Sequence, residues 1–109
     1  MRRGDIVIVA VSGDFGKPRP AVIVQSDALA QEGVSFIICQ MTTDLSDLPN
    51  VRITIDPTVE NGLRLRSQIM VDRPTTLRTH RIGRKIGALN PADIRRLNRA
   101  LSFAMGLLD

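Results

Sequence analysis

Hydrophobic residues in the first half of the chain gather into short runs rich in valine and isoleucine, a pattern that is typical of β-strands. These runs cover residues 5–11, 21–25 and 34–41, and glycine, proline, serine and aspartate separate them. Because the runs are almost continuously apolar rather than alternating, we expect both faces of these three strands to be buried.

Residues 51–55 follow a different pattern, in which apolar and polar side chains alternate strictly. This alternation predicts a strand whose valine and two isoleucines face inward, while Arg52 and Thr54 face water. The strand therefore has one dry side and one wet side.

Turn-forming residues delimit the remaining strands. Asn61-Gly62 predicts a turn, and residues 67–72 form a further strand that Pro74 is expected to end. Residues 85–89 are expected to form a shorter last strand.

A single helix is predicted at the end of the chain. Asn90 suits an N-cap, Pro91 suits the first helical position, and Asp93 adds negative charge to the first turn. An apolar stripe at helical spacing follows, and three arginines project from the remaining surface. The stripe is Ile94, Leu97, Leu101, Ala104 and Leu108, and the arginines are Arg95, Arg96 and Arg99. Strands closed by one C-terminal helix predict a single domain over residues 1–109, a small, barrel-like and strand-dominated α+β fold.

Positive charge is concentrated in the second half of the chain. Residues 1–63 carry five cations and eight acids, whereas residues 64–109 carry ten cations and three acids, and thirteen of the fifteen cations are arginine. Arginine is suited to phosphate and carboxylate groups, which favours nucleic acid or an acidic protein as a partner. A solvated arginine-rich face is the alternative. With no Trp, no Tyr and three Phe, binding of single strands on a base-stacking sheet is disfavoured.

Composition also argues against several other classes. No apolar run is long enough to cross a membrane, and residues 6–11 are too short for a signal peptide. Cys39, the single cysteine, cannot form an internal disulfide and is expected in the core, which fits the cytoplasm. His80, the single histidine, is expected at the surface rather than as a base. Neither zinc-ligand spacing nor a glycine-rich phosphate loop is present, so no metal site is expected.

The stretch FGKPRPAVIVQSD at residues 15–27 holds a cation in a restricted geometry. The prolines on either side of Arg19 each fix φ at about −65°, which forces the Arg19 backbone toward an extended conformation and aims its guanidinium. That guanidinium could clamp a phosphodiester, and the Thr42 hydroxyl could bond a phosphate oxygen as charge builds up. Alternatively, residues 18–20 are a rigid turn, and Thr42 and Thr43 end a strand without further role.

Three motifs in this order resemble the toxin of MazF/PemK type II toxin–antitoxin pairs. The motifs are RGDIV at residues 3–7, RPAVIVQSD at residues 19–27 and MTT at residues 41–43. The resemblance extends through Leu48-Pro49 and the later strands to AMGLL at residues 104–108, so it covers nearly the whole chain.

This resemblance implies a small SH3-like barrel, shared by CcdB and PemK, that forms a homodimer and is neutralised by an acidic antitoxin protein. It implies metal-independent, sequence-selective cleavage of single-stranded RNA without a cofactor, with Arg19 and Thr42 acting at the scissile phosphate. The ribose 2′-OH would attack its own phosphorus and leave a cyclic phosphate and a free 5′-hydroxyl.

The family pattern also implies auxiliary residues. Lys17 and Thr43 are expected to help to bind RNA, and Asp72 and Arg73 stand where the family contacts RNA bases, although a plain ion pair at a strand end is the alternative. Some members carry an arginine at the position of Met70, for which Arg73 and Arg66 are the nearest substitutes. The loop between Val11 and Lys17 is shorter than in many members.

Two other functions are compatible with the same fold. A CcdB-like toxin would poison gyrase by binding it, but that family ends in a Trp-Gly-Ile element and this chain has no Trp. A non-catalytic RNA-binding barrel would need only the arginine-rich second half.

Overall fold

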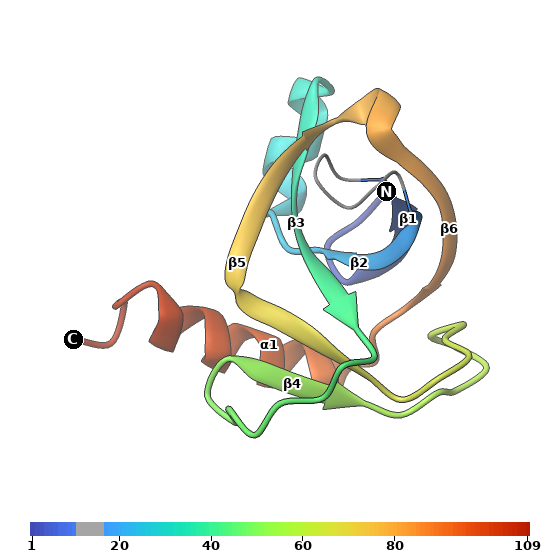
Figure 1. Cartoon of the computed structure of the whole chain (residues 1–109). Coiled ribbons are helices and arrows are strands. Elements are labelled where there is room, and N and C mark those ends of the chain that lie inside the picture. Colours follow the sequence, from blue (N-terminus) through green and yellow to red (C-terminus); the bar gives the residue numbers. More distant parts are fainter. Residues whose placement is uncertain (11–16) are drawn as a thin grey trace.

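Six antiparallel strands form one strongly curled sheet, and one α-helix packs across it near the end of the chain (Figure 1). The computed structural model describes residues 1–10 and 17–109. The strands are β1 (Asp5–Val9), β2 (Arg19–Ile23), β3 (Ser35–Thr42), β4 (Arg52–Ile55), β5 (Ser67–Arg78) and β6 (Ile82–Ala88). The helices are the 3₁₀ turns η1 (Asp27–Glu32) and η2 (Thr79–Arg81) and the α-helix α1 (Pro91–Ala104).

The strand order in the sheet is β4-β5-β3-β2-β1-β6, so β4 and β6 are its edges. The predicted strand-dominated α+β fold with a C-terminal helix is confirmed. The sheet curls as a barrel does, but it stays open, because no ladder among the described residues joins β4 to β6.

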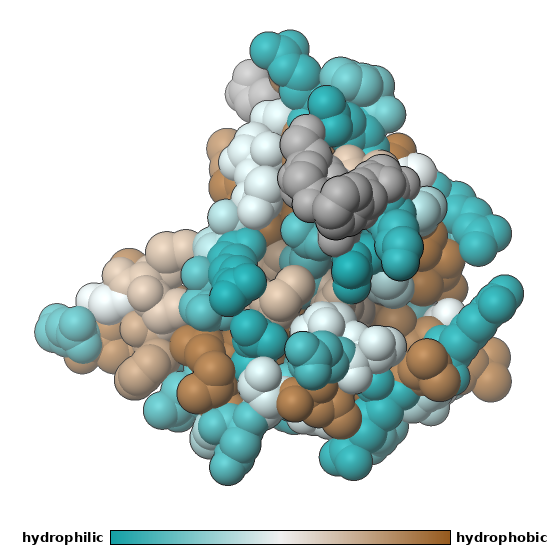
Figure 2. All heavy atoms as spheres, viewed as in Figure 1, coloured by the Kyte–Doolittle hydropathy of each residue, from teal (hydrophilic) through white to brown (hydrophobic). Residues whose placement is uncertain are grey.

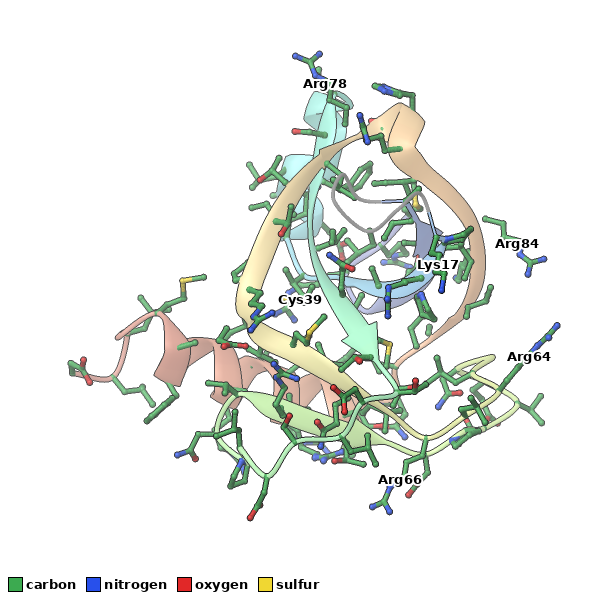
Figure 3. All side chains as sticks on the ribbon, viewed as in Figure 1. Lys17, Cys39, Arg64, Arg66, Arg78 and Arg84 are labelled. Atoms are coloured by element: carbon green, nitrogen blue, oxygen red, sulfur yellow. The ribbon has the colours of Figure 1, made fainter. Side chains whose placement is uncertain are left out.

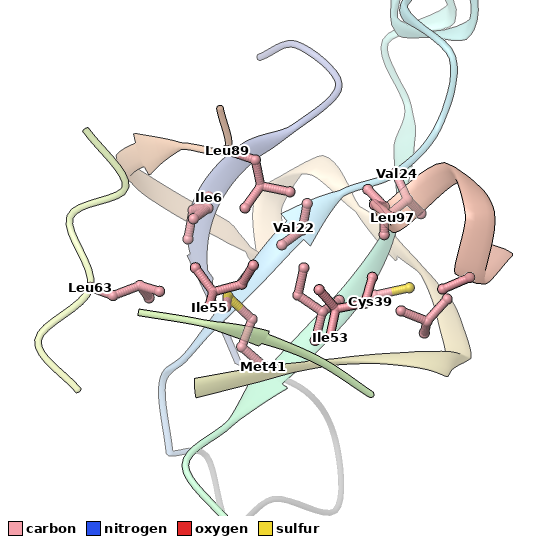
Figure 4. Close-up of a cluster of buried hydrophobic side chains, with 13 residues drawn as sticks. Ile6, Val22, Val24, Cys39, Met41, Ile53, Ile55, Leu63, Leu89 and Leu97 are labelled. Atoms are coloured by element: carbon pink, nitrogen blue, oxygen red, sulfur yellow. The ribbon is translucent and has the colours of Figure 1, made fainter. Parts of the chain in front are cut away.

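The strands β1, β2 and β3 bury side chains on both faces, as their continuous apolar runs predicted. Val22 on β2 and Cys39 on β3 belong to the larger cluster, which Leu97 of α1 covers (Figure 4). Their sequence neighbours Ala21 and Ile38 point the other way, into a second cluster formed by side chains of β1, β2, β3 and β5. Alternate side chains of each strand therefore fill two separate cores.

Three expectations about the strands are wrong. The last strand is not a short one over residues 85–89, because β6 runs for seven residues from Ile82 to Ala88. Pro74 does not end β5, which continues to Arg78; Pro74 stands opposite Cys39, next to a register irregularity between Cys39 and Met41, where a missing ladder donor is tolerated. Arg52 does not face open water either, because its side chain is only 9% exposed. The strand β4 thus lacks a fully wet side.

The helix α1 begins as predicted and ends earlier than its apolar stripe. The Asn90 side chain accepts a hydrogen bond from the Asp93 backbone N–H at 2.8 Å. The helix stops at Ala104, and Gly106 adopts a left-handed φ of 70°, which lets the Leu107 N–H return to the Ser102 carbonyl. No helix in the described part of the chain is both long and apolar enough to cross a bilayer.

That early stop changes the packing of the predicted stripe. Leu97 is fully buried, while Ala104 and Leu108 are exposed, and Ala100 is buried although the stripe did not include it. The last residues of the stripe therefore form surface rather than core.

The Asn61-Gly62 turn is confirmed, and it lies directly against β6. The Asn61 side chain is buried and accepts hydrogen bonds from the Thr58 and Leu63 backbone N–H groups, both at 3.0 Å. A Cβ on Gly62 would collide with the Ile86 carbonyl, and one on Gly87 would collide with the Asn61 backbone. Two glycines thus allow loop and strand to meet backbone to backbone.

The N-cap generates a stability prediction. Replacing Asn90 with alanine should lower the free energy of unfolding by about 1 kcal/mol, because the Asp93 N–H loses its acceptor. Urea denaturation at fixed protein concentration measures this, with Asn98→Ala in the middle of the same helix as the control. Equal losses in both variants would show that the cap contributes nothing.

Candidate active site

Pairing between β2 and β3 brings the two predicted catalytic residues together. Ala21 stands opposite Gln40 and Val22 opposite Cys39 in this antiparallel ladder. Arg19 is the first residue of β2 and Thr42 is the last residue of β3, so both lie at the same end of this antiparallel pair. Residues more than twenty positions apart in the chain thereby become neighbours at one end of the two strands.

Both residues line one pocket of about 300 Å³, which we call the Arg19 pocket. Four of the six residues predicted for the site come together here. The lining consists of Lys17, Pro18, Arg19, Pro20, Met41, Thr42, Thr43 and Ser67. Ser67 was not predicted, because a lone serine at the start of a strand carries no pattern that distinguishes it from a turn residue.

The Thr42 hydroxyl has a defined orientation. Its oxygen accepts a hydrogen bond from the Asp44 backbone N–H at 3.0 Å. A threonine hydroxyl carries one donor proton in addition to its acceptor lone pairs, so the proton can be offered to a ligand in the pocket. The local turn therefore prepares Thr42 as a donor to an anion.

The pocket provides positive charge and hydrogen-bond donors. Lys17 is exposed and Arg19 is half-buried between two prolines that line the same pocket. A half-buried guanidinium keeps its planar fork of donors, which matches the oxygens of a phosphate. Together with the Thr42 hydroxyl, this arrangement can stabilise charge on a phosphorus centre.

The other candidate groups lie elsewhere. His80 is exposed in η2, as expected for a surface residue. Within residues 1–10 and 17–109, no three or more His, Cys, Asp or Glu side chains are placed to hold a metal ion. The loop before Lys17, predicted to be short, falls at positions outside the described residues.

Asp72 and Arg73, also predicted to touch RNA, do not line the Arg19 pocket. Both are exposed on β5, and an Asp72 carboxylate oxygen lies 3.9 Å from the Arg52 Nε. That Nε is buried and makes no hydrogen bond, so the carboxylate is its nearest charge partner among the ion pairs described. The structure thus shows the ion pair that was the alternative interpretation of Asp72.

A cation lies next to Met70, the position at which the family pattern includes an arginine in some members. Met70 stands opposite Arg52 across the β4–β5 ladder, which places a cation next to the substituted position. Arg66, one of the substitutes expected from the sequence, lies 3.2 Å from a carboxylate oxygen of Asp56. Arg52 was not predicted, because the strand pairing that places it there is not visible in the sequence.

Cys39 lies under this corner of the sheet and is fully buried, as expected. Its burial, with a smaller contribution from the negative charge of Asp72, raises the pKa of the thiol from 9.0 to about 12. The side chain therefore behaves as a neutral core residue and not as a nucleophile.

Comparisons of the sequence with known proteins identify related toxins. The profile of a family described as PemK-like, MazF-like toxins of type II toxin–antitoxin systems matches residues 2–105. A protein of Mycolicibacterium smegmatis named probable endoribonuclease MazF is 38% identical over 108 residues, which is 98% of each chain.

Solved structures share the fold. A mycobacterial endoribonuclease in complex with its cognate antitoxin superposes with a TM-score of 0.83 at 22% identity, covering 98% of this chain and 96% of the other. The Mycobacterium tuberculosis toxin MazF-mt6 gives 0.81 at 24% identity, with 94% and 96% covered. A MazE–MazF structure from Deinococcus radiodurans gives 0.78 at 17% identity, with 97% and 95% covered.

The buried thiol generates a prediction about pH. An unfolded chain releases the Cys39 proton at about pH 9.0, whereas the folded chain keeps it to about pH 12, so the free energy of unfolding should fall as pH rises through that interval. A Cys39→Ala variant should lack this component of the decline. Maleimide should label the wild-type thiol quickly in urea and barely at all in the folded state at pH 8. Equal labelling rates in the two states would contradict the assignment.

Proposed function

Because the chain belongs to the PemK/MazF family of toxins from type II toxin–antitoxin systems, we propose that it is an endoribonuclease that cleaves single-stranded RNA in the Arg19 pocket. One observation carries the site assignment: Arg19 and Thr42 reach the same pocket from neighbouring strands. The family match favours cleavage over gyrase poisoning and over RNA binding alone.

In the proposed reaction the scissile phosphate occupies the Arg19 pocket. The ribose 2′-OH loses its proton as its oxygen attacks the phosphorus, the bond to the 5′-oxygen breaks, and that oxygen takes up a proton. The products are a 2′,3′-cyclic phosphate and a 5′-hydroxyl. Arginine stays protonated in proteins, so the role of Arg19 is to stabilise the added negative charge. The Thr42 hydroxyl donates a hydrogen bond to a non-bridging oxygen.

Other residues extend the contact with RNA. Lys17 and Thr43 line the same pocket and are proposed to hold the backbone beside the scissile phosphate. Asp72 and Arg73 lie further along β5, so any contact they make is proposed to involve more distant nucleotides. The proposed reaction uses no metal ion and no cofactor.

An acidic antitoxin is the proposed protein partner. The ten cations and three acids of residues 64–109 give a surface that attracts acidic segments. Such a segment, disordered when free, would lose conformational entropy as it orders on the toxin. The pair is proposed to act in the cytoplasm, where messenger, ribosomal and transfer RNA are available.

A homodimer is proposed to form through the end of α1. Large apolar side chains are exposed there, and Figure 2 shows them as a brown and tan area over the end of the helix. Two of them, Phe103 and Leu108, line a groove of about 530 Å³, and Leu48 of the loop before β4 lines the same groove. Contiguous exposed apolar surface of this kind marks interaction sites.

The catalytic assignment is tested by single substitutions. Arg19→Ala should lower kcat by about a hundredfold to a thousandfold, the effect of removing a preorganised charge stabiliser. Thr42→Val should also slow cleavage, whereas Thr42→Ser keeps the hydroxyl and should retain more activity. Cleavage of an unstructured RNA in EDTA measures both, with Arg78→Ala as the charge-matched control. Activity that disappears in EDTA and returns with magnesium would contradict the metal-free mechanism.

The dimer is tested by one charge placed in the apolar surface. Leu108 is 74% exposed, and Leu108→Asp should shift the molecule toward monomer, because a buried unpaired carboxylate opposes association. Light scattering after gel filtration gives the mass. Val59 is 95% exposed outside this surface, so Val59→Asp should leave the mass unchanged. A monomeric wild-type protein would rule the interface out.

A further inference from the structure

A second pocket adjoins the Arg19 pocket and has about 350 Å³, within the range of about 300–1,000 Å³ that is usual for ligand sites. The two pockets share Pro20, Thr43 and Ser67 as lining residues. We call the second one the arginine groove. Its other lining residues are Ile8, Gly62, Leu63, Arg64, Leu65, Arg84 and Ile86. One continuous depression therefore runs from Arg19 toward the loop before β5 and the strand β6.

The arginine groove combines an apolar surface with positive charge. Ile8 and Ile86 are half-buried, Leu65 is 65% exposed, and Arg64 and Arg84 are both exposed. Figure 3 shows Arg64 and Arg84 projecting on the same side of the molecule as Lys17, whereas Arg78 lies at the far end of β5. Among the described residues that line the two pockets, four are cationic and none is acidic. A ligand with apolar faces and repeated negative charge matches this surface.

The walls of the groove are fixed relative to each other. The loop that carries Arg64 is joined to the strand that carries Arg84 by the hydrogen bond from the Ala88 N–H to the Glu60 carbonyl, at 2.9 Å. At Gly62 and Gly87 the two backbones are packed so closely that a Cβ at either position would collide with the opposite segment. A groove that is already formed costs less conformational entropy when a ligand binds.

We propose that the arginine groove binds the nucleotides next to the scissile phosphate, on one side of the cut. Arg64 and Arg84 hold backbone phosphates, and the bases lie against Leu65 and Ile86 through apolar contact instead of aromatic stacking. RNA is the occupant because the groove opens from the pocket in which its phosphate is held, so one strand fills both without a gap. This assignment rests on the proposed endoribonuclease activity and makes these four residues determinants of substrate affinity and base preference.

The groove is tested first by RNA binding. The binding probe is a single-stranded RNA with one 2′-deoxy nucleotide at the cut site, which prevents attack. Arg84→Ala and Arg64→Ala should each weaken its binding about tenfold, as expected for one lost charge-assisted contact. Each should reduce the slope of log K against log salt by about 0.7. Leu65→Ser should weaken binding without changing that slope.

Substrate length gives a second readout, which separates a groove contact from a general loss of charge. Cleavable RNAs are shortened one nucleotide at a time from the 5′ or the 3′ end. We compare kcat/KM of the wild type with that of Arg84→Ala. The ratio should fall when nucleotides are removed from the end that occupies the groove, because the contact with Arg84 is then lost in both proteins. It should stay constant when nucleotides are removed from the other end. The Arg78→Ala control should show neither dependence.

The outcomes distinguish this inference from the proposed function. A wild-type protein that binds the probe but never cuts RNA would refute the catalytic proposal. A wild-type protein that cuts RNA while the Arg64, Arg84 and Leu65 variants behave like Arg78→Ala would overturn the groove assignment alone. Variants that lose affinity only for an acidic peptide would overturn it too, and would assign the groove to a protein partner.

Discussion

The register between β2 and β3 is the constraint on which the site depends. Both strands bury alternate side chains in two different cores, so a slip of one residue would exchange the contents of both. The Gln25 side chain extends the pairing beyond β2, because its Oε1 accepts a hydrogen bond from the Ile37 N–H at 3.1 Å. Packing far from the surface thus determines which residues meet at the other end of the strands, where Arg19 and Thr42 lie.

Features of the fold that depend on residues close together in the chain could be predicted from the sequence. The N-cap at Asn90 and the turn at Asn61-Gly62 depend on residues only a few positions away, and both are confirmed. The path of β5 through Pro74 was predicted wrongly, because the register irregularity that accommodates the proline involves β3, more than thirty residues earlier. Burial of Arg52 was missed for the same reason, since its neighbours come from elsewhere in the chain.

The residues of the candidate site also fall into two groups: those found through sequence motifs and those visible only in the structure. Arg19 and Thr42 were found through motifs, and the structure brings them to one pocket with Lys17 and Thr43. Ser67 and the arginine groove were not foreseen, because they arise where a loop, an edge strand and two central strands meet. No short sequence motif describes such a junction. For Asp72 the family pattern identified the position but not the neighbour of the side chain, because its carboxylate lies 3.9 Å from the Arg52 Nε.

An open sheet leaves two edges whose unpaired backbone groups could recruit another chain, and this protein limits both. The strand β4 has four residues, which is too short to template a long ladder. The strand β6 is irregular, because its pairing with β1 shifts register on either side of Val7, and it carries the exposed Arg84, whose charge repels an identical edge. Both edges therefore oppose edge-to-edge polymerisation of the unclosed barrel into fibrils.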